Sequence, residues 1–251
     1  MVFNQKGGVG KSTILCNLAA INAREGRSTL VIDLDPQGNA SQYLLGSDWD
    51  QQETNIARYL ESTLSFRLGD TDPAEYCVET PWEDLWIMPA SMGLLDLRGK
   101  LEAKHKIYKL RDALQQLEDT VDDIYVDTPP AFDFYTLSAL IAADRCIIPF
   151  DCDEFSRKAL YQLLDNIEET RLDHNPGLKL EGVVVNQYQG RSRLPQRIVQ
   201  ELKDEGLPIL EPLISSSVVV KESHEASRPL IHFRRSHKLT LEFEELHRTL
   251  S

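Results

Sequence analysis

The sequence predicts an α/β fold in which helices cover both faces of a doubly wound, mainly parallel β-sheet. Short β-rich segments alternate with longer amphipathic helical segments, which is the pattern of parallel strands joined by helical crossovers. The 251 residues, 41% hydrophobic and 27% charged, are enough for one large domain with its own core. No repeat, low-complexity tract or linker divides the chain, so we expect residues 1–251 to form a single domain.

The expected elements follow one another in a regular order. A very short strand at Val2-Phe3 precedes a helix over residues 12–25, which Gly26 ends. Further strands are expected at residues 28–32, 85–88, 124–126, 146–150, 182–185 and near 209–214. Amphipathic helices are expected at about residues 97–118, 135–143, 156–171, 194–205 and 237–249. The segment 45–80 indicates only a helix and loops, and no function is taken from it.

Charge and composition exclude several classes of protein. The net charge of −13 lies entirely within residues 1–180, so the body of the molecule is unsuited to coating nucleic acid or an anionic membrane. No apolar run approaches the roughly 18–20 residues that span a bilayer. Residues 1–8 lack the basic start and apolar stretch of a signal peptide. The four cysteines form no C-x-x-C pair, which argues against a zinc site or a redox dithiol, and we expect a cytoplasmic protein.

A glycine-rich segment between the first strand and the first helix predicts a phosphate-binding loop. It reads Lys6-Gly7-Gly8-Val9-Gly10-Lys11-Ser12-Thr13. Glycines allow successive backbone N–H groups to point into one concavity, and the start of a helix favours anions. Lys11 could then reach the phosphates and the Ser12 hydroxyl could bind Mg²⁺. The generic motif has glycine where this chain has Gln5, and an ordinary glycine-rich turn is the alternative.

Two aspartates end predicted strands at the edge where ligands of doubly wound sheets bind. Asp35 lies in Asp33-Leu34-Asp35-Pro36-Gln37-Gly38-Asn39, and Asp127 ends the apolar run Ile124-Tyr125-Val126. The first could position a water for attack on a phosphate or hold the water shell of a metal. The second could hold Mg²⁺ through water. A turn at the first position and a solvated strand end at the second are the alternatives.

Together these motifs resemble those of the ParA/MinD family of deviant Walker A ATPases, most closely its ParA/Soj partition branch. The resemblance covers nearly the whole chain except about 45–85. It is carried by N-Q-K-G-G-V-G-K-S-T, V-I-D-L-D-P-Q-G-N-A-S, V-D-T-P-P and the late stretch Gly182-Val183-Val184-Val185-Asn186. It implies a slow, Mg²⁺-dependent ATPase that is a homodimer when ATP is bound. It further implies an activating partner protein, ParB-like or of another kind, and a role in partition of plasmid or chromosome DNA or in positioning another cargo.

The resemblance also implies roles for individual residues. Lys6 matches the signature lysine that reaches across the dimer to the partner's nucleotide, Lys11 matches the phosphate lysine, and Asp35 matches the residue that positions the hydrolytic water. These three are the candidate catalytic residues.

ATP and Mg²⁺ are the expected cofactors. Asn186 matches the position that recognises adenine, although an asparagine that merely ends a strand is the alternative. The expected nucleotide-binding residues are Gly7, Gly8, Val9, Gly10, Lys11, Ser12, Thr13 and Asn186. The expected metal site comprises Ser12, Asp35 and the Walker B acid, Asp127.

The C-terminal third departs from the family where DNA binding is concerned. Family members commonly carry two arginines that take part in non-specific DNA binding, and Ser216 and Val219 stand at those positions here. Basic residues remain nearby in sequence, and a solvated helix start is the alternative for them. The candidate DNA contacts are Arg191, Arg193, Arg197, Arg234 and Arg235. If they bind DNA, the protein would be associated with the nucleoid.

Other functions can be weighed from the same sequence. The last predicted helix is acidic on its polar face, which argues against a membrane-binding helix. An adaptor that recruits a protein and never binds DNA, and an amidoligase-like enzyme that activates a carboxylate with ATP, remain alternatives. Five of the histidines, at positions 105, 174, 224, 232 and 237, suggest no triad and are expected at the surface.

Overall fold

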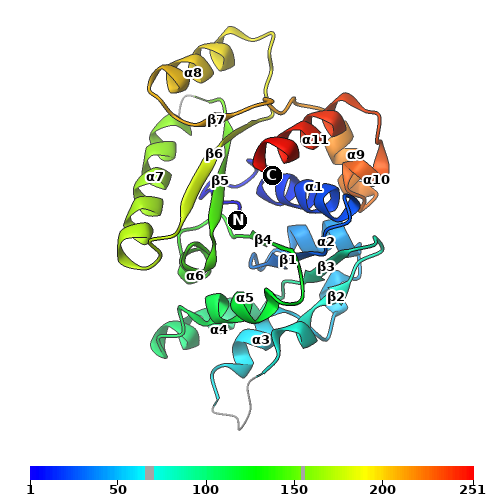
Figure 1. Ribbon diagram of the computed structural model, residues 1–251, viewed down its shortest axis with the longest axis vertical. Coiled ribbons are helices and arrows are strands. Elements are labelled where there is room, and N and C mark those ends of the chain that lie inside the picture. Colours follow the sequence, from blue (N-terminus) through cyan, green and yellow to red (C-terminus); the bar gives the residue numbers. More distant parts are fainter. Residues whose placement is uncertain (66–70, 154–155) are drawn as a thin grey trace.

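A central sheet organises the computed structural model, which describes residues 1–65, 71–153 and 156–251 (Figure 1). One part has the strand order β2-β3-β1-β4 and the other the order β5-β6-β7. All described strand pairs are parallel except β2 with β3. The strands are β1 Thr29–Asp33, β2 Val78–Glu79, β3 Leu85–Met88, β4 Asp123–Asp127, β5 Arg145–Asp151, β6 Lys179–Asn186 and β7 Ile209–Leu210.

The first three residues join these two parts of the sheet. The backbone N–H of Val2 donates to Val126 in β4 at 3.2 Å, and that of Phe3 donates to Ile147 in β5 at 3.0 Å. The N–H of Ile147 donates in turn to the carbonyl of Met1 at 3.0 Å. The predicted strand at Val2-Phe3 therefore lies between β4 and β5, although only Val2 forms a β-bridge.

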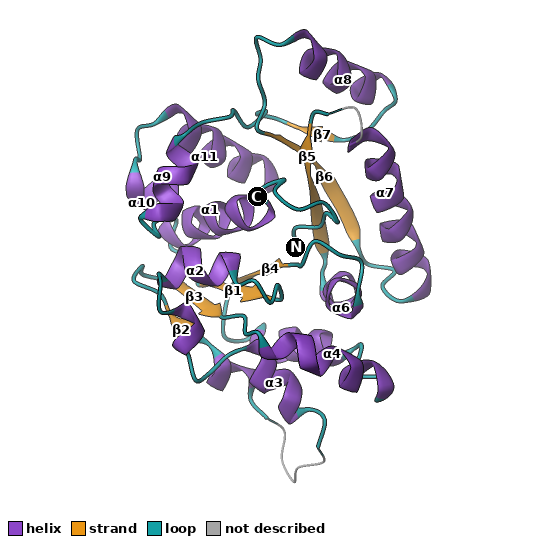
Figure 2. Cartoon of the chain, turned by 180° about the vertical axis from the view of Figure 1, so that it is seen from behind, coloured by secondary structure: helices purple, strands orange, loops and turns teal. Residues whose placement is uncertain are grey.

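One face of the sheet packs against the helices that begin and end the chain. Val31, Ile87, Ile147 and Val184 point into this core. Helix α1 is covered by α2, α10 and α11, and Figure 2 shows this group from behind. The helices of this face are α1 Lys11–Arg24, α2 Asn39–Leu45, α9 Val219–Glu225, α10 Leu230–Phe233 and α11 Lys238–Leu250.

The opposite face packs against the remaining helices in two clusters. Leu30, Ile32 and Val126 face the first cluster, and Ile148 and Val185 face the second. Adjacent strand residues thus point into different cores, as expected for a sheet buried on both faces. The helices are α3 Ile56–Ser62, α4 Gly93–Ala103, α5 Lys109–Leu117, α6 Phe134–Ala142, α7 Ser156–Asp173 and α8 Arg193–Asp204.

Most predicted elements are confirmed, but some differ, and helices α2, α9 and α10 lie outside the predicted elements. The single helix predicted at 97–118 is wrong, because His105 has a φ of 54° and the chain turns there between α4 and α5. The last predicted strand is limited to Ile209–Leu210. Within the segment 45–80 the structure has α3, strand β2 and two short 3₁₀ turns, Trp49–Gln51 and Pro73–Tyr76, while residues 66–70 lie outside the described residues. Among the helices that the structure describes, none is both long and apolar enough to cross a membrane.

Candidate functional site

The glycine-rich loop continues directly from the chain segment that joins the two parts of the sheet. It leads into α1 at the carboxyl ends of the strands, between β4 and β5. Gly8 and Gly10 have φ angles of 77° and 89°, a left-handed conformation that favours glycine. A Cβ atom on Gly10 would lie 2.2 Å from the Asn186 side-chain nitrogen, so this position also excludes other residues by space.

Lys11 lies inside this loop rather than on the surface. Its side chain is buried, and its Nζ donates to the Lys6 carbonyl at 3.3 Å. Burial lowers the pKa of Lys11, and the carboxylates of Asp127 and Asp35 oppose that change. A desolvated ammonium group held beside the start of a helix is well placed to bind phosphate oxygens.

Asp127 and Ser12 carry oxygen atoms that could hold a magnesium ion. Asp127 is fully buried at the end of β4, and its Oδ1 accepts from the Thr128 backbone N–H at 3.1 Å. Its Oδ2 is buried without a hydrogen-bond partner among the described residues. Burial raises the pKa of Asp127 to about 6, opposed by the Ser12 hydroxyl and by Lys11. A buried carboxylate oxygen without a partner beside a hydroxyl fits a bound Mg²⁺.

Asp33 fixes the segment that carries Asp35. Asp33 is fully buried and its Oδ2 accepts from both the backbone N–H and the hydroxyl of Ser41, each at 2.8 Å. Its Oδ1 accepts from the backbone N–H of Asp35 at 3.0 Å. Burial raises the pKa of Asp33 to about 8, and the two hydrogen bonds from Ser41 oppose this change. Asp35 itself is buried and accepts from the Gln37 N–H at 3.0 Å, and burial raises its pKa too.

Lys6 points away from its own phosphate loop. Its Nζ lies 3.5 Å from Asp151 Oδ2, forms an ion pair with Asp153 and lies 3.4 Å from Ser156 Oγ. These partners come from the end of β5 and the start of α7. The hydrogen bond to Asp153 raises the pKa of Lys6, and about 40% of the side chain is exposed. The two lysines of the loop therefore occupy different environments.

Asn186 and Gln187 contact the loop from the end of β6. The side-chain amide of Asn186 donates to the Val9 carbonyl at 2.8 Å, and that of Gln187 donates to the Gly8 carbonyl at 2.9 Å. Gln187 has a φ of 54°, an uncommon conformation for a residue with a side chain. The structure thus places Asn186 against the loop backbone. The sequence pattern does not reveal Gln187, because an exposed glutamine after a strand carries no signal.

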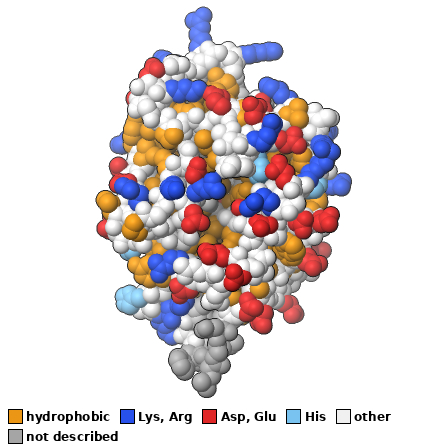
Figure 3. Space-filling model, in the orientation of Figure 1, with side chains coloured by type: hydrophobic (Ala, Val, Ile, Leu, Met, Phe, Trp, Pro, Cys, Tyr) orange, Lys and Arg blue, Asp and Glu red, His pale blue; other side chains and the backbone are white. Residues whose placement is uncertain are grey.

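The predicted DNA-contact arginines occupy two separate places. Arg191, Arg193 and Arg197 lie around the start of α8, whereas Arg234 and Arg235 follow α10; the two helices stand well apart in Figure 1. Basic side chains project from the end of the molecule where α8 lies (Figure 3). Arg197 pairs with Glu201 at 3.6 Å and Arg234 with Glu222 at 3.0 Å. Within the described residues, Arg191 and Arg193 form no ion pair and are exposed.

Of the five histidines predicted at the surface, only His105 is exposed; the other four are half-buried, and two of them stack on aromatic rings. His224 and His232 are half-buried, and their rings stack on Tyr43 and Trp82 at centroid distances of 3.9 and 5.3 Å. Neither aromatic partner could be assigned from spacing, because both lie more than a hundred residues away in the chain.

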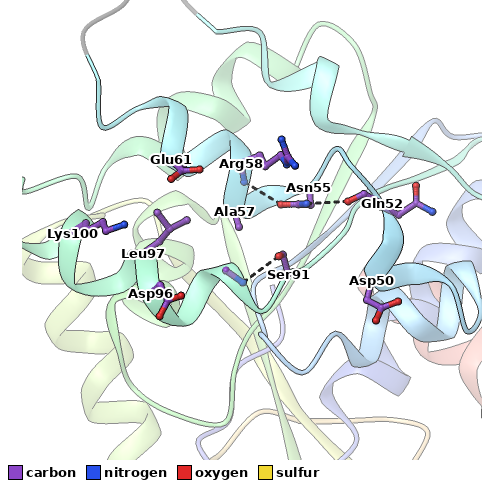
Figure 4. A pocket seen from close by; sticks show the side chains of 11 residues that line it. Asp50, Gln52, Asn55, Ala57, Arg58, Glu61, Ser91, Asp96, Leu97 and Lys100 are labelled. Atoms are coloured by element: carbon purple, nitrogen blue, oxygen red, sulfur yellow. Dashed lines mark hydrogen bonds between the residues drawn. The ribbon is translucent and has the colours of Figure 1, made fainter.

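A polar pocket of about 370 Å³ lies elsewhere, between the start of α3 and α4 (Figure 4). Asn55 Oδ1 accepts from the Arg58 N–H at 3.1 Å, and Ser91 Oγ accepts from the Gly93 N–H at 3.2 Å. These side chains satisfy the first turns of the two helices. No predicted site residue lines the pocket, so we place the candidate site at the phosphate loop.

Comparison with known proteins agrees with this geometry. A family model described as an AAA domain matches residues 1–180. The chromosome partitioning protein ParA of Myxococcus xanthus is 33% identical over 232 residues, which cover 92% of this chain and 79% of that protein. The sporulation initiation inhibitor protein Soj of Bacillus subtilis is 29% identical over 232 residues, 92% of this chain and 88% of that one. The chain belongs to the ParA/MinD family of P-loop ATPases.

Solved structures extend the comparison to the fold of this ParA/MinD-family protein. The crystal structure of cobyrinic acid a,c-diamide synthase from Mycobacterium smegmatis, with bound ADP and magnesium, has a TM-score of 0.83 and 28% identity. It covers 99% of this chain and 91% of that one. The structure of apo McdA from Cyanothece has a TM-score of 0.85 at 20% identity, covering 100% of this chain and 98% of that one, and shows the fold alone. The predicted family and fold class are confirmed, and the ADP and magnesium of the first structure support the predicted cofactors.

Proposed function

We propose that this chain is an ATP-dependent switch of the ParA type, with residues 1–251 acting as one ATPase domain in the cytoplasm. ATP and Mg²⁺ bind at the phosphate loop, the ATP-bound form is a homodimer, and slow hydrolysis separates the subunits. A ParB-like or other partner protein accelerates hydrolysis. The dimer acts in partition of plasmid or chromosome DNA or in positioning another cargo.

The orientation of Lys6 is the observation that carries this proposal. Lys11 already supplies a buried ammonium group to the loop, while Lys6 extends outward to Asp151 and Asp153. Because its side chain is about 40% exposed, it is accessible to a second molecule. Because the Lys6 ammonium group does not point into its own phosphate loop, its orientation supports a contact with the nucleotide of a partner subunit.

The other site residues support binding and hydrolysis. Ser12 and Asp127 would hold Mg²⁺, which neutralises phosphate charge when bound. Asp35 lies on the backbone segment that Asp33 fixes, and it would orient the attacking water. Its raised pKa follows from burial, so its carboxylate is a better proton acceptor than an exposed aspartate.

Two variants test the switch. With ATP and Mg²⁺, Asp35→Ala should bind nucleotide, lose turnover and accumulate as a dimer in sedimentation. Lys6→Ala should bind ATP with near-normal affinity and stay monomeric, because only the contact to the partner's phosphate is removed. Equal oligomeric states for the two variants would contradict the role of Lys6 across the dimer. A wild-type chain that stays monomeric with ATP would contradict the switch itself.

A second candidate function is an ATP-switched adaptor that recruits a protein and does not bind DNA. Ser216 and Val219 replace two arginines of the family pattern, and Arg197 and Arg234 are already paired with carboxylates. Absence of DNA binding by the ATP-bound dimer at 50 mM salt would favour this adaptor over the DNA carrier.

An amidoligase-like enzyme is the third candidate. It is favoured by the likeness to the structure named as cobyrinic acid a,c-diamide synthase, at 28% identity and a TM-score of 0.83. Such an enzyme would hydrolyse ATP only when a small carboxylic acid is present. Turnover by the purified chain alone would count against it.

A further inference from the structure

His224, far along the chain, contacts the first turn of the phosphate-loop helix. Its Nε2 lies 2.9 Å from the Thr13 hydroxyl oxygen, in hydrogen-bond distance. Thr13 follows Ser12 and lies two residues after Lys11, so this contact reaches the turn of α1 predicted to hold the phosphates. The ring belongs to α9, which the sequence pattern did not predict as a helix.

Two further contacts fix the position of this ring. It stacks on Tyr43 of α2 with a centroid distance of 3.9 Å and an angle of 13° between the planes. The Tyr43 hydroxyl is 2.8 Å from that of Ser223, the residue before His224. Tyr43 and Ser223 are buried. The ring on which His224 stacks and the residue that precedes His224 are therefore both held in the core.

A fourth helix, α10, joins the same cluster. The Asn17 amide of α1 donates to the carbonyl of Thr13 at 2.8 Å and to the Tyr43 hydroxyl at 3.4 Å. Its Oδ1 accepts from the backbone N–H of Leu230, at the start of α10, at 2.7 Å. The cluster therefore links the phosphate-loop helix, the C-terminal helices and α2, which begins directly after the segment Asp35–Gly38.

Burial keeps the imidazole neutral. Desolvation lowers the pKa of His224, so the ring adds no positive charge to the loop at neutral pH. A neutral imidazole has one donor and one acceptor nitrogen, and a threonine hydroxyl can take either role. The contact therefore orients the Thr13 hydroxyl and the first turn of α1, and it does not attract phosphate directly.

We propose that His224 is a positioning residue for nucleotide binding. It acts on the phosphate loop through the Thr13 hydroxyl. Through its stack on Tyr43 it also fixes helix α2, which follows the segment that carries Asp35. This inference rests on the proposed ATPase function and deepens it. It assigns to α9 a role in setting the geometry of the ATP site, although none of its residues belongs to the predicted nucleotide-binding set.

The decisive variant is His224→Phe, which keeps an aromatic ring on Tyr43 and removes the nitrogen that contacts Thr13. We expect ATP–Mg²⁺ affinity, measured by calorimetry, to fall about three- to tenfold, the size expected for one lost hydrogen bond. His224→Gln, whose amide nitrogen can reach Thr13, should recover most of this loss. His232→Phe is the matched control, since that ring stacks on Trp82 and, among the described residues, has no hydrogen bond to the loop. Its ATP affinity should equal that of the wild type.

A double-mutant cycle separates positioning from general support of the fold. Thr13→Val removes the hydroxyl, and in its presence His224→Phe should cause no further loss of affinity. Additive losses, or wild-type affinity in folded His224→Phe, would overturn the proposal while leaving the ATPase function intact. Equal affinities of His224→Gln and His224→Phe would overturn it as well. Absence of ATP binding by the wild-type chain would overturn the ATPase function and this inference together.

Discussion

At the scale of single residues, burial decides what the charged groups of this site can do. Lys11 and Asp127 are both removed from solvent at the mouth of the loop. Burial lowers the pKa of the lysine and raises that of the aspartate, because desolvation destabilises the charged form of each group. The opposite charge of the other group only partly offsets this cost. A bound phosphate and a bound cation would relieve both costs at once, so we expect the site to bind a metal–nucleotide pair more tightly than either alone.

Lys11→Ala tests this electrostatic account. Removal of the buried ammonium group eliminates a charge-assisted contact to phosphate that is worth about 1.5–3 kcal/mol. ATP affinity should therefore fall at least about tenfold in calorimetry. A folded variant, judged by an unchanged circular dichroism spectrum, that binds ATP with wild-type affinity would contradict the phosphate-loop assignment.

His232 predicts a pH dependence of stability. Burial, and to a lesser degree the charges of Arg24 and Arg228, lowers the pKa of His232 to about 4 from its ordinary 6.5. Between these values the unfolded chain binds a proton that the folded chain does not, so the free energy of unfolding should rise with pH across that window. The contribution is on the order of 1 kcal/mol, since the ring is only half-buried and solvent screens it. In urea unfolding at pH 5 and pH 7.5, His232→Phe should lose less stability on acidification than the wild type does.

At the scale of elements, α8 is the part of the proposed DNA-binding function that can be tested first. Arg191 and Arg193 are exposed around its start, and the helix projects from one end of an otherwise acidic molecule (Figures 1 and 3). The arginines that follow α10 lie elsewhere, so each subunit offers a small basic surface. The proposed ATP-bound dimer would double that surface, which would link any DNA contact to ATP binding.

Combined replacement of Arg191 and Arg193 by Glu should abolish ATP-dependent, sequence-independent DNA binding. With roughly 4–8 phosphates contacted per dimer, the slope of log affinity against log salt should be about −4 to −7 in the wild type. Lys100→Glu in α4 with Lys104→Glu just after it changes the net charge equally at the other end of the molecule and should leave most of the binding. Equal losses for the two pairs would show that only total charge matters. ATP turnover without DNA should be unchanged in both.

Some of the helices and strands could be predicted from the sequence, and others could not. Strands β1, β3, β4, β5 and β6 follow from apolar runs, and the loop follows from its glycines, because these signals are local. The break between α4 and α5 depends on a left-handed His105, which no periodicity reveals. Helix α9 and the contacts of His224 depend on tertiary packing against α1 and α2. The amide of Asn186 could be placed at the site from the sequence, but its bond to the Val9 carbonyl could not.

At the scale of the whole molecule, residues 1–3 hold the two parts of the sheet together. Phe3 is fully buried, while the nearby Phe132 ring, 6.1 Å away between centroids, is 39% exposed. Phe3→Ala should lower the free energy of unfolding by about 3–5 kcal/mol, measured by urea denaturation. Phe132→Ala, the matched control, should lower the free energy of unfolding by less than about 1 kcal/mol, because the Phe132 ring is already partly exposed to water in the folded protein. Similar losses of stability for the two variants would contradict a special role of residues 1–3 in holding the two parts of the sheet together.

This joint has a consequence for how the molecule responds to heat. The chain runs from the joint straight into the phosphate loop, with Asp127 of β4 on one side and Asn186 of β6 on the other. A nucleotide bound in the loop would contact groups attached to both parts of the sheet and would so hold the joint together. Since it binds only the folded arrangement, it raises the melting temperature as its occupancy rises. The heat resistance of the protein would then follow its own nucleotide cycle, with this added stability lost each time the product leaves.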